Sequence, residues 1–205
     1  MWRRSFYAFR AASEINALFA ACSDWLSSTS VLFSVATLTD RVMASKVEFQ
    51  VQADQVDIEV LWKALTKDKF EVARKAAPDL FAEWQVLESE GNGGNIGLGS
   101  LLYFRFGPVA PNVEPFKERI VELDEGNHLV KFQGIEGGFM KKGLTYYVLS
   151  FKLGHIGEGN TKINATFTYD LEKDFDGTQL LEEFIKVVKY YLNSAVSFLQ
   201  QKNNA

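Results

Sequence analysis

The sequence predicts an α+β fold, in which a curved antiparallel sheet of seven strands wraps around one long C-terminal helix. Two short helices follow the first strand. Three observations lead to this prediction. Short segments that alternate apolar and polar residues follow one another along most of the chain, as in half-buried strands. Tight turns containing Gly and Asn separate them, so sequential strands are expected to pair antiparallel. The C-terminal segment instead repeats its apolar residues at helical spacing.

The first elements are a strand and the two short helices. Residues 46–53 alternate apolar and polar side chains. Asp57 is suited to cap a helix that runs to about residue 65. A second helix near residues 69–77 ends before Pro78, because proline disfavours the helical conformation in the residue that precedes it. The remaining strands are predicted at residues 81–89, 100–106, 116–123, 128–135, 144–153 and 161–169.

The C-terminal helix is predicted from Thr178 to about Gln201, roughly 35 Å at 1.5 Å per residue. Asp176, with Gln179 three residues later, is a capping-box variant that marks its start. Because the inner face of the sheet needs an apolar cover, we expect this helix to lie across it and to leave a hollow in between. Its apolar stripe consists of Leu181, Phe184, Ile185, Val188, Leu192, Ala195, Val196 and Leu199.

Composition excludes several classes of function. The chain has 205 residues, 47% hydrophobic and 14% aromatic, enough apolar material for the core of one domain. A net charge of −4 gives no general attraction to nucleic-acid phosphates. Cys22 is the sole cysteine, so no intrachain disulfide can form. Only His128 and His155 are available, which rules out a multi-histidine metal site; both adjoin predicted turns and are expected at the surface. We therefore expect neither a metal nor a cofactor.

Residues 1–42 differ in composition from the rest of the chain and are predicted to be an N-terminal extension of a 43–205 domain. They contain four arginines, no lysine and three acids, and are rich in serine. Three interpretations stay open. The segment can be an upstream extension from a mis-assigned start, because Met43-Ala44-Ser45-Lys46 resembles a natural beginning. It can be an organellar transit peptide, or a helix that docks on the domain. No apolar run here reaches the roughly 20 residues that span a bilayer, so membrane insertion is not expected.

Three local motifs accompany the predicted elements in a fixed order. They are Glu90-Gly91-Asn92-Gly93-Gly94, Lys117-Glu118-Arg119 and Ile135-Glu136-Gly137-Gly138. Together with the element order, they resemble the Bet v I family, which includes pathogenesis-related class-ten proteins, major latex proteins and norcoclaurine synthases. The resemblance covers the chain from Met43 onward. It implies a START-like helix-grip fold with a large apolar cavity that binds small hydrophobic plant molecules, such as hormones, flavonoids, sterols or alkaloids, in defence or hormone response.

The glycine-rich loop does not fit a nucleotide-binding motif. A phosphate-binding P-loop ends in Gly-Lys-Ser/Thr and runs into a helix, whereas here Gly99 is followed by Ser100 and Leu101 and by a predicted strand. We therefore interpret the loop as a structural hairpin, about two residues longer than the family form. Its glycine-rich positions are Gly91, Asn92, Gly93, Gly94, Gly97 and Gly99.

The resemblance also allows the catalytic positions of norcoclaurine synthases to be compared. Aligned on the Ile135-Glu136-Gly137-Gly138 motif, the catalytic Glu of those enzymes falls on Glu118. The Tyr falls on Phe116, the Lys on Val130 and the Asp on Leu149. Three of the four polar groups are thus replaced by apolar side chains, which removes most of the acid–base chemistry of that condensation. No confident catalytic set remains, and the predicted pocket becomes more apolar.

Glu118 and Tyr147 are the polar groups that we expect in the pocket. Glu118 alternates with Phe116 and Ile120 and is assigned to the cavity side, where a carboxyl would be partly desolvated. The alternative is a solvated surface acid, and for Tyr147 an ordinary core position. The complete expected set of ligand-binding residues is Phe104, Phe106, Phe116, Glu118, Val130, Phe132, Tyr147, Leu149, Phe151, Ala165, Phe167, Leu181, Phe184 and Ile185.

The functional expectation is a protein that binds and carries or stores a small hydrophobic ligand without changing it. One alternative is a condensing enzyme similar to norcoclaurine synthase that uses Glu118. Another is a module that presents a ligand-dependent surface to an unknown protein partner. We expect a monomer that binds no nucleic acid. Its expected location is the cytoplasm, with the nucleus as a second compartment, or an organelle if residues 1–42 are a transit peptide.

Overall fold

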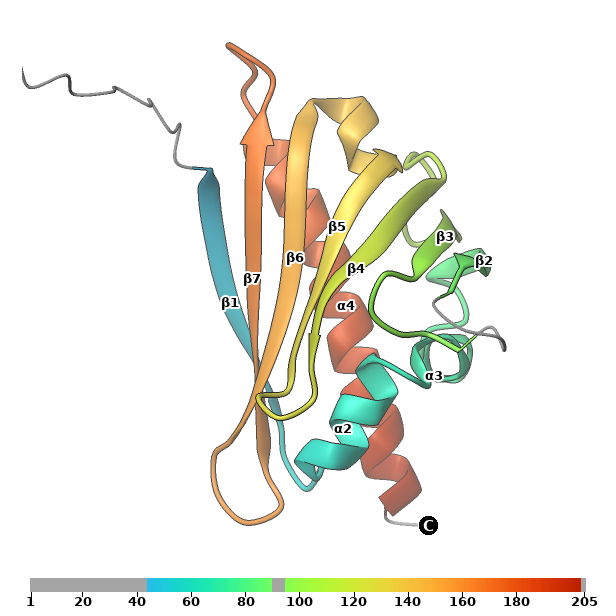
Figure 1. Cartoon of the computed structure of the whole chain (residues 1–205), viewed down its shortest axis with the longest axis vertical. Helices are drawn as coiled ribbons and strands as arrows, with labels where there is room; N and C mark the ends of the chain where they lie inside the picture. Colours follow the sequence, from blue (N-terminus) through green and yellow to red (C-terminus); the bar gives the residue numbers. More distant parts are fainter. Residues whose placement is uncertain (1–43, 90–94, 204–205) are drawn as a thin grey trace, which may run out of the picture. The chain divides into compact units, whose positions relative to one another are not determined.

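The computed structural model describes residues 44–89 and 95–203 (Figure 1). Predictions for residues 1–42 and for Gly91, Asn92, Gly93 and Gly94 lie outside the described residues. The elements in chain order are β1 (Ser45–Ala53), α2 (Ile58–Leu65), α3 (Lys69–Ala76), β2 (Phe81–Glu88), β3 (Leu101–Phe106), β4 (Phe116–Asp124), β5 (Leu129–Gly137), the 3-10 helix η1 (Gly138–Lys142), β6 (Leu144–His155), β7 (Thr161–Leu171) and α4 (Thr178–Asn203).

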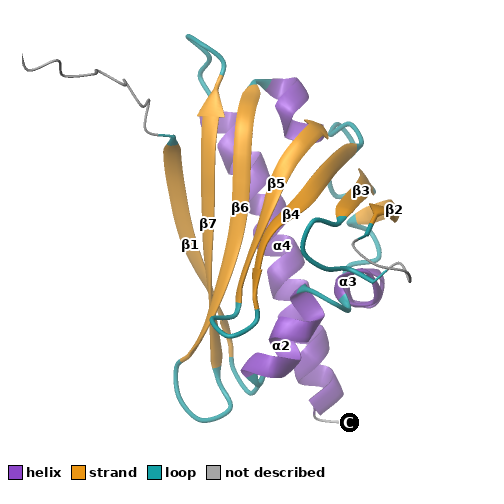
Figure 2. Ribbon diagram, in the orientation of Figure 1, coloured by secondary structure: helices purple, strands orange, loops and turns teal. Residues whose placement is uncertain are grey.

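The seven described strands form one antiparallel sheet in the order β1-β7-β6-β5-β4-β3-β2. From β2 to β7 each strand therefore pairs with its neighbour in sequence, and the first strand closes the far edge by pairing with the last. Figure 2 shows the sheet curving around α4, with α2 and α3 near the C-terminal end of that helix. The predicted fold class, including the two short helices after the first strand, is confirmed.

One face of the sheet is apolar because buried and less buried side chains alternate along its strands, most regularly in β6 and β7. In β6, the side chains of Tyr147, Leu149, Phe151 and Leu153 are buried, while those between them are not. β7 repeats this pattern from Thr161 to Tyr169, as expected when successive residues point to opposite faces. α4 covers this face with an apolar stripe along its 26 residues, about 39 Å at 1.5 Å per residue.

The apolar stripe of α4 is rotated slightly from the predicted one. Leu181 and Ile185 are only half-buried, whereas Leu180 and Tyr191 are buried. In a helix with several adjacent apolar residues, the sequence allows stripes that differ by about one position, and packing against the sheet selects one of them. The start of the helix also differs from the predicted capping box. The Asp176 carboxylate accepts hydrogen bonds from Thr178. The Gln179 side chain donates to Glu183 instead of reaching back to Asp176, so the reciprocal capping box is not formed.

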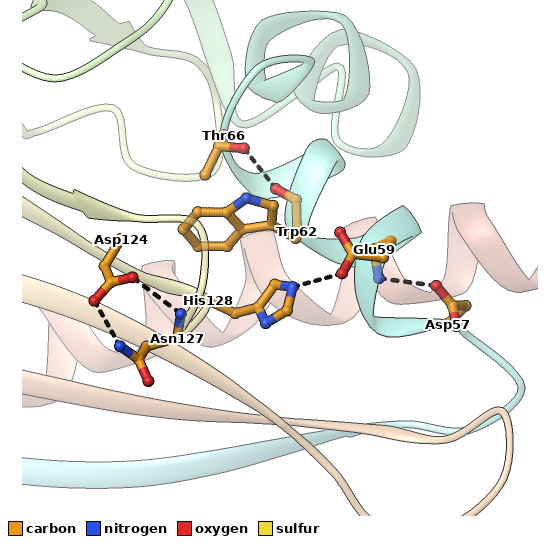
Figure 3. Close-up of polar contacts among 7 residues, drawn as sticks. All are labelled: Asp57, Glu59, Trp62, Thr66, Asp124, Asn127 and His128. Carbon is orange, nitrogen blue, oxygen red and sulfur yellow. Dashed lines mark hydrogen bonds and ion pairs between the residues drawn. The ribbon is translucent and has the colours of Figure 1, made fainter.

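The start of α2 is held by its cap and by a turn of the sheet (Figure 3). Asp57 caps the helix as predicted, its Oδ1 accepting a hydrogen bond from the Glu59 backbone N–H at 2.8 Å. Glu59 in turn contacts Nε2 of His128 at 2.9 Å. His128 follows the β4–β5 turn and packs edge-on against Trp62, so it is partly buried, although its contact with Glu59 is at the surface. His155 is exposed, as expected.

Candidate ligand-binding site

A hollow lies between the inner face of the sheet and α4, at the end of the sheet formed by β2 to β6. Its free volume is only about 50 Å³, enough for one or two water molecules. The residues that line it come from α3, the segment before β2, the four strands β2, β3, β4 and β6, η1 and α4. They are Lys69, Leu80, Phe81, Phe104, Phe106, Phe116, Glu118, Phe139, Tyr147, Leu149, Phe151, Phe184, Val187, Val188 and Tyr191.

The hollow is far smaller than the large apolar cavity expected from the sequence. The reason is that the phenylalanines expected as walls also fill the space. Phe104 and Phe106 each stack on Phe116 with ring centroids 5.0 Å apart. Phe184 of α4 meets Phe139 at 5.1 Å and Phe167 at 3.9 Å. Aromatic contacts of this kind stabilise the closed arrangement beyond their buried area.

Glu118 faces the hollow, so the surface alternative for this residue is wrong. It is 6% exposed, between Lys117 and Arg119, which point outward. Those two side chains pair with Glu136 and Glu88 on the outer side of the sheet. In the motif Lys117-Glu118-Arg119, the two basic side chains thus form ion pairs with neighbouring strands, while the Glu118 carboxyl points to the interior.

Tyr147 donates a hydrogen bond from its hydroxyl to Oε1 of Glu118 at 3.1 Å. A glycine makes this contact possible. Gly134 lies opposite Glu118 in the β4–β5 register, and a Cβ at this position would lie 2.1 Å from Cε1 of Tyr147. The Tyr147 ring therefore occupies the space above Gly134, and from there its hydroxyl reaches Glu118.

Burial controls the ionisation of this pair. Loss of solvation raises the pKa of Glu118 above its usual value, while Lys69 and the Tyr147 hydrogen bond oppose the shift. The pKa of Tyr147 is raised well above its usual value, first by burial and then by the Glu118 charge. Glu118 can therefore hold or release a proton at a higher pH than an exposed glutamate can, and Tyr147 remains a donor.

Lys69 lines the hollow, although it was not expected there from the sequence. It is the first residue of α3 and is buried. Its Nζ lies 3.8 Å from the centroid of the Phe132 ring and 5.5 Å from that of Phe104. The sequence does contain a signal for the burial of Lys69. This residue lies three and four positions before Val72 and Ala73, which are buried on the same face of the helix.

The predicted ligand-binding residues fall into three groups. Eight line the hollow: Phe104, Phe106, Phe116, Glu118, Tyr147, Leu149, Phe151 and Phe184. Four are buried in the core but do not line it: Val130, Phe132, Ala165 and Phe167. Leu181 and Ile185 are half-buried on α4 and lie outside the hollow, because the buried stripe of the helix is rotated from the predicted one.

A second, outer groove adjoins the hollow. It has a volume of about 290 Å³ and lies between the β3–β4 loop, η1 and α4. Phe139 and Val187 line both spaces, so these two side chains form the partition between the interior hollow and the outer groove.

The described glycines of the long loop have structural roles. The backbone N–H of Gly97 donates to Oγ of Ser100, and the N–H of Gly99 donates to the carbonyl of Ile120 in β4. The Gly99 carbonyl accepts from the Arg119 guanidinium at 2.7 Å. These contacts tie the described end of the loop to β4 and leave neither N–H free for a phosphate.

The described residues contain no group of three or more His, Cys, Asp or Glu side chains that could bind a metal ion. Among the helices of residues 44–89 and 95–203, none is long and apolar enough to cross a membrane.

Residues 42–200 match the family described as the Pathogenesis-related protein Bet v 1 family. The chain therefore belongs to this family. The match begins one residue before the domain boundary predicted from the sequence.

Two relatives illustrate the range of proteins that the chain resembles. It is 28% identical over 146 residues to an S-norcoclaurine synthase of Thalictrum flavum subsp. glaucum, covering 71% of this chain and 63% of the synthase. The chain thus spans less than two thirds of that enzyme's length. It is 27% identical over 141 residues to the probable intracellular pathogenesis-related protein T1 of Catharanthus roseus, covering 65% of this chain and 86% of that protein.

Solved structures show the same fold. A truncated norcoclaurine synthase from Thalictrum flavum has a TM-score of 0.62 at 18% identity and covers 76% of this chain and 93% of its own. Major latex-like protein 151 from Panax ginseng has a TM-score of 0.58 at 20% identity, with coverages of 74% and 97%. A START superfamily protein from Mycobacterium smegmatis reaches 0.59 at 12% identity, with coverages of 76% and 97%. The fold is the START-like helix-grip fold.

Proposed function

We propose that this protein binds and carries a small apolar molecule in the hollow between the sheet and α4. The observation that carries the proposal is the buried Glu118–Tyr147 pair at the wall of an otherwise largely apolar space. Pockets for small molecules typically combine apolar walls with a few polar groups that orient the ligand. Carriage is favoured over a synthase activity like that of the S-norcoclaurine synthase relative because, by the resemblance, Phe116, Val130 and Leu149 stand at three of the four catalytic polar positions of those enzymes.

Room for such a ligand comes from the partition between the two spaces. The hollow has about 50 Å³ and the outer groove about 290 Å³, and both are lined by Phe139 and Val187. Displacing the Phe139 ring joins the two volumes and opens a path from the surface to Glu118. The size of the inner space favours the smaller members of the hormone, flavonoid, sterol and alkaloid classes.

Fluorescence titration with 8-anilinonaphthalene-1-sulfonate, an anionic dye with apolar aromatic rings, tests this proposal. Leu149→Phe enlarges a side chain that lines the hollow, whereas Leu153→Phe enlarges a buried side chain on the same strand that does not. We expect the first substitution to weaken dye binding by at least about tenfold, or 1.4 kcal/mol, and the second by less than about twofold. Equal affinities for both variants and the original chain would place the binding elsewhere, and an absence of saturable binding would contradict the proposal.

A further inference from the structure

The Lys69 amine is placed unusually for a lysine side chain. It lies inside the hollow among aromatic rings, with its Nζ 3.8 Å from the Phe132 centroid and 5.6 Å from that of Tyr191. Among the described residues, no acceptor lies within hydrogen-bonding or ion-pairing distance of this nitrogen. The Tyr191 hydroxyl, which lines the same hollow, is likewise buried without a hydrogen-bond partner in the described part of the chain.

The Lys69 amine packs against β5 through the ring of Phe132. The lysine of norcoclaurine synthases aligns with Val130, which is apolar here. Lys69 comes from a different element, but its Nζ rests on the ring of Phe132, two residues further along the same strand. The hollow thus holds a primary amine, the Glu118 carboxyl and two tyrosine hydroxyls.

Burial distinguishes Lys69 from the other lysines of the chain. Loss of solvation lowers its pKa to about 8, against the opposing effect of Glu118. The titratable groups that line the hollow with it are Glu118, Tyr147 and Tyr191. None of the other fourteen lysines is buried. At pH 7.5, about a quarter of Lys69 amines are then unprotonated, against roughly 0.1% of exposed lysines with ordinary pKa values.

We propose that Lys69 captures a slim apolar aldehyde as a covalent imine within the hollow. This inference rests on the proposed function, because it requires a small molecule to enter the same space. A desolvated lysine in an apolar pocket is a recognised nucleophile toward carbonyl compounds. Room for the aldehyde comes from displacing the Phe139 ring, which joins the hollow to the outer groove, and the narrow aromatic walls favour an unbranched, apolar aldehyde over a bulky ketone.

The reaction is balanced without an oxidant or a reductant. The unprotonated Nζ attacks the carbonyl carbon, the C=O π bond opens, and a proton moves from nitrogen to oxygen to give a carbinolamine. Glu118, whose pKa is raised by burial, donates a proton to that hydroxyl as the C–O bond breaks and water leaves. The resulting iminium nitrogen carries a positive charge in the same hollow as the Glu118 carboxylate, which takes back the proton through the released water molecule to give the neutral imine. Glu118 thus serves as the proton donor and acceptor of the hollow.

Reductive trapping tests the proposal on the full chain. The protein is incubated at pH 7.5 with hexanal and sodium cyanoborohydride, which reduces an imine to a stable hexyl-lysine, and the product is located by intact-mass and peptide mass spectrometry. We expect one hexyl group, at Lys69, in at least about tenfold excess over any other lysine. The labelling rate should reach half its maximum near pH 8, whereas exposed lysines label progressively up to pH 10 and beyond.

Two variants serve as controls. Lys69→Met removes the amine from a buried position, and Lys69→Arg keeps the charge without a nucleophilic amine; both should lose the selective label while circular dichroism shows a native spectrum. Labelling that spreads evenly over the lysines, or that persists in either variant, would overturn the proposal.

Binding of 1-hexanol, which cannot form an imine, separates the proposed imine at Lys69 from the proposed ligand carriage. Hexanol binding without a Lys69 label refutes the imine alone, whereas absence of both refutes the proposed function as well.

Discussion

Gly134→Ala is expected to destabilise the protein through the Glu118–Tyr147 pair. The new Cβ would lie 2.1, 2.5 and 2.6 Å from three ring carbons of Tyr147, where carbon atoms in contact prefer about 3.5–4.0 Å. The ring must therefore retreat by about 1.5 Å, which breaks the 3.1 Å hydrogen bond to Glu118. A buried carboxyl without its donor costs about 1–3 kcal/mol, and overpacking costs about 1–3 kcal/mol more. We expect a loss of about 2–6 kcal/mol, or roughly 5–20 °C in Tm.

Urea unfolding followed by circular dichroism measures this loss. Gly154→Ala is the matched control, because Gly154 lies on β6 and a Cβ there meets nothing within 4 Å. It should be neutral or stabilise the protein by up to about 1 kcal/mol, since glycine weakens a strand. In a Tyr147→Ala background the ring is gone, and Gly134→Ala should behave like the control. The same large loss in both backgrounds, or a loss below about 1 kcal/mol in the original chain, would refute the role assigned to Gly134.

Two further predictions concern the N-terminal half of the domain. Lys69 has its pKa lowered from 10.5 to about 8 in the folded protein, so between these pH values the unfolded chain binds more protons and the native state gains stability as pH rises. From pH 8 to 10 the free energy of unfolding of the original chain should therefore rise by about 2 kcal/mol relative to Lys69→Met; parallel urea-unfolding profiles would contradict the assigned burial. Asp57→Ala should cost about 1 kcal/mol because it removes the cap of α2. Asp68→Ala should cost less, since Asp68 makes no side-chain capping bond to α3, and equal losses in thermal unfolding would be evidence against the cap.

Much of the fold follows from local patterns. The period-two alternation in β4 placed Phe116 and Glu118 on the inner face, and burial in the structure agrees. The order of short strands and tight turns was enough to predict an antiparallel sheet, because sequential strands joined by short turns have few other ways to pair. The rotation of α4 could not be predicted from local patterns: the buried stripe includes Leu180 and Tyr191 in place of the predicted Leu181 and Ile185. Helical spacing limits the buried arc but does not fix its rotation.

The sequence by itself determined the element order and membership of a ligand-binding fold family, and it put Phe116, Glu118 and Ile120 on one face of β4, while the structure decided that this face is the inner one. Only the tertiary structure decided how much space remains in the core, because that depends on how rings from β3, β4, η1 and α4 stack against one another. It also decided that Lys69, on a short helix far from Phe132 in sequence, rests on that ring. Both outcomes depend on contacts between segments distant in the chain, and no local periodicity encodes such contacts.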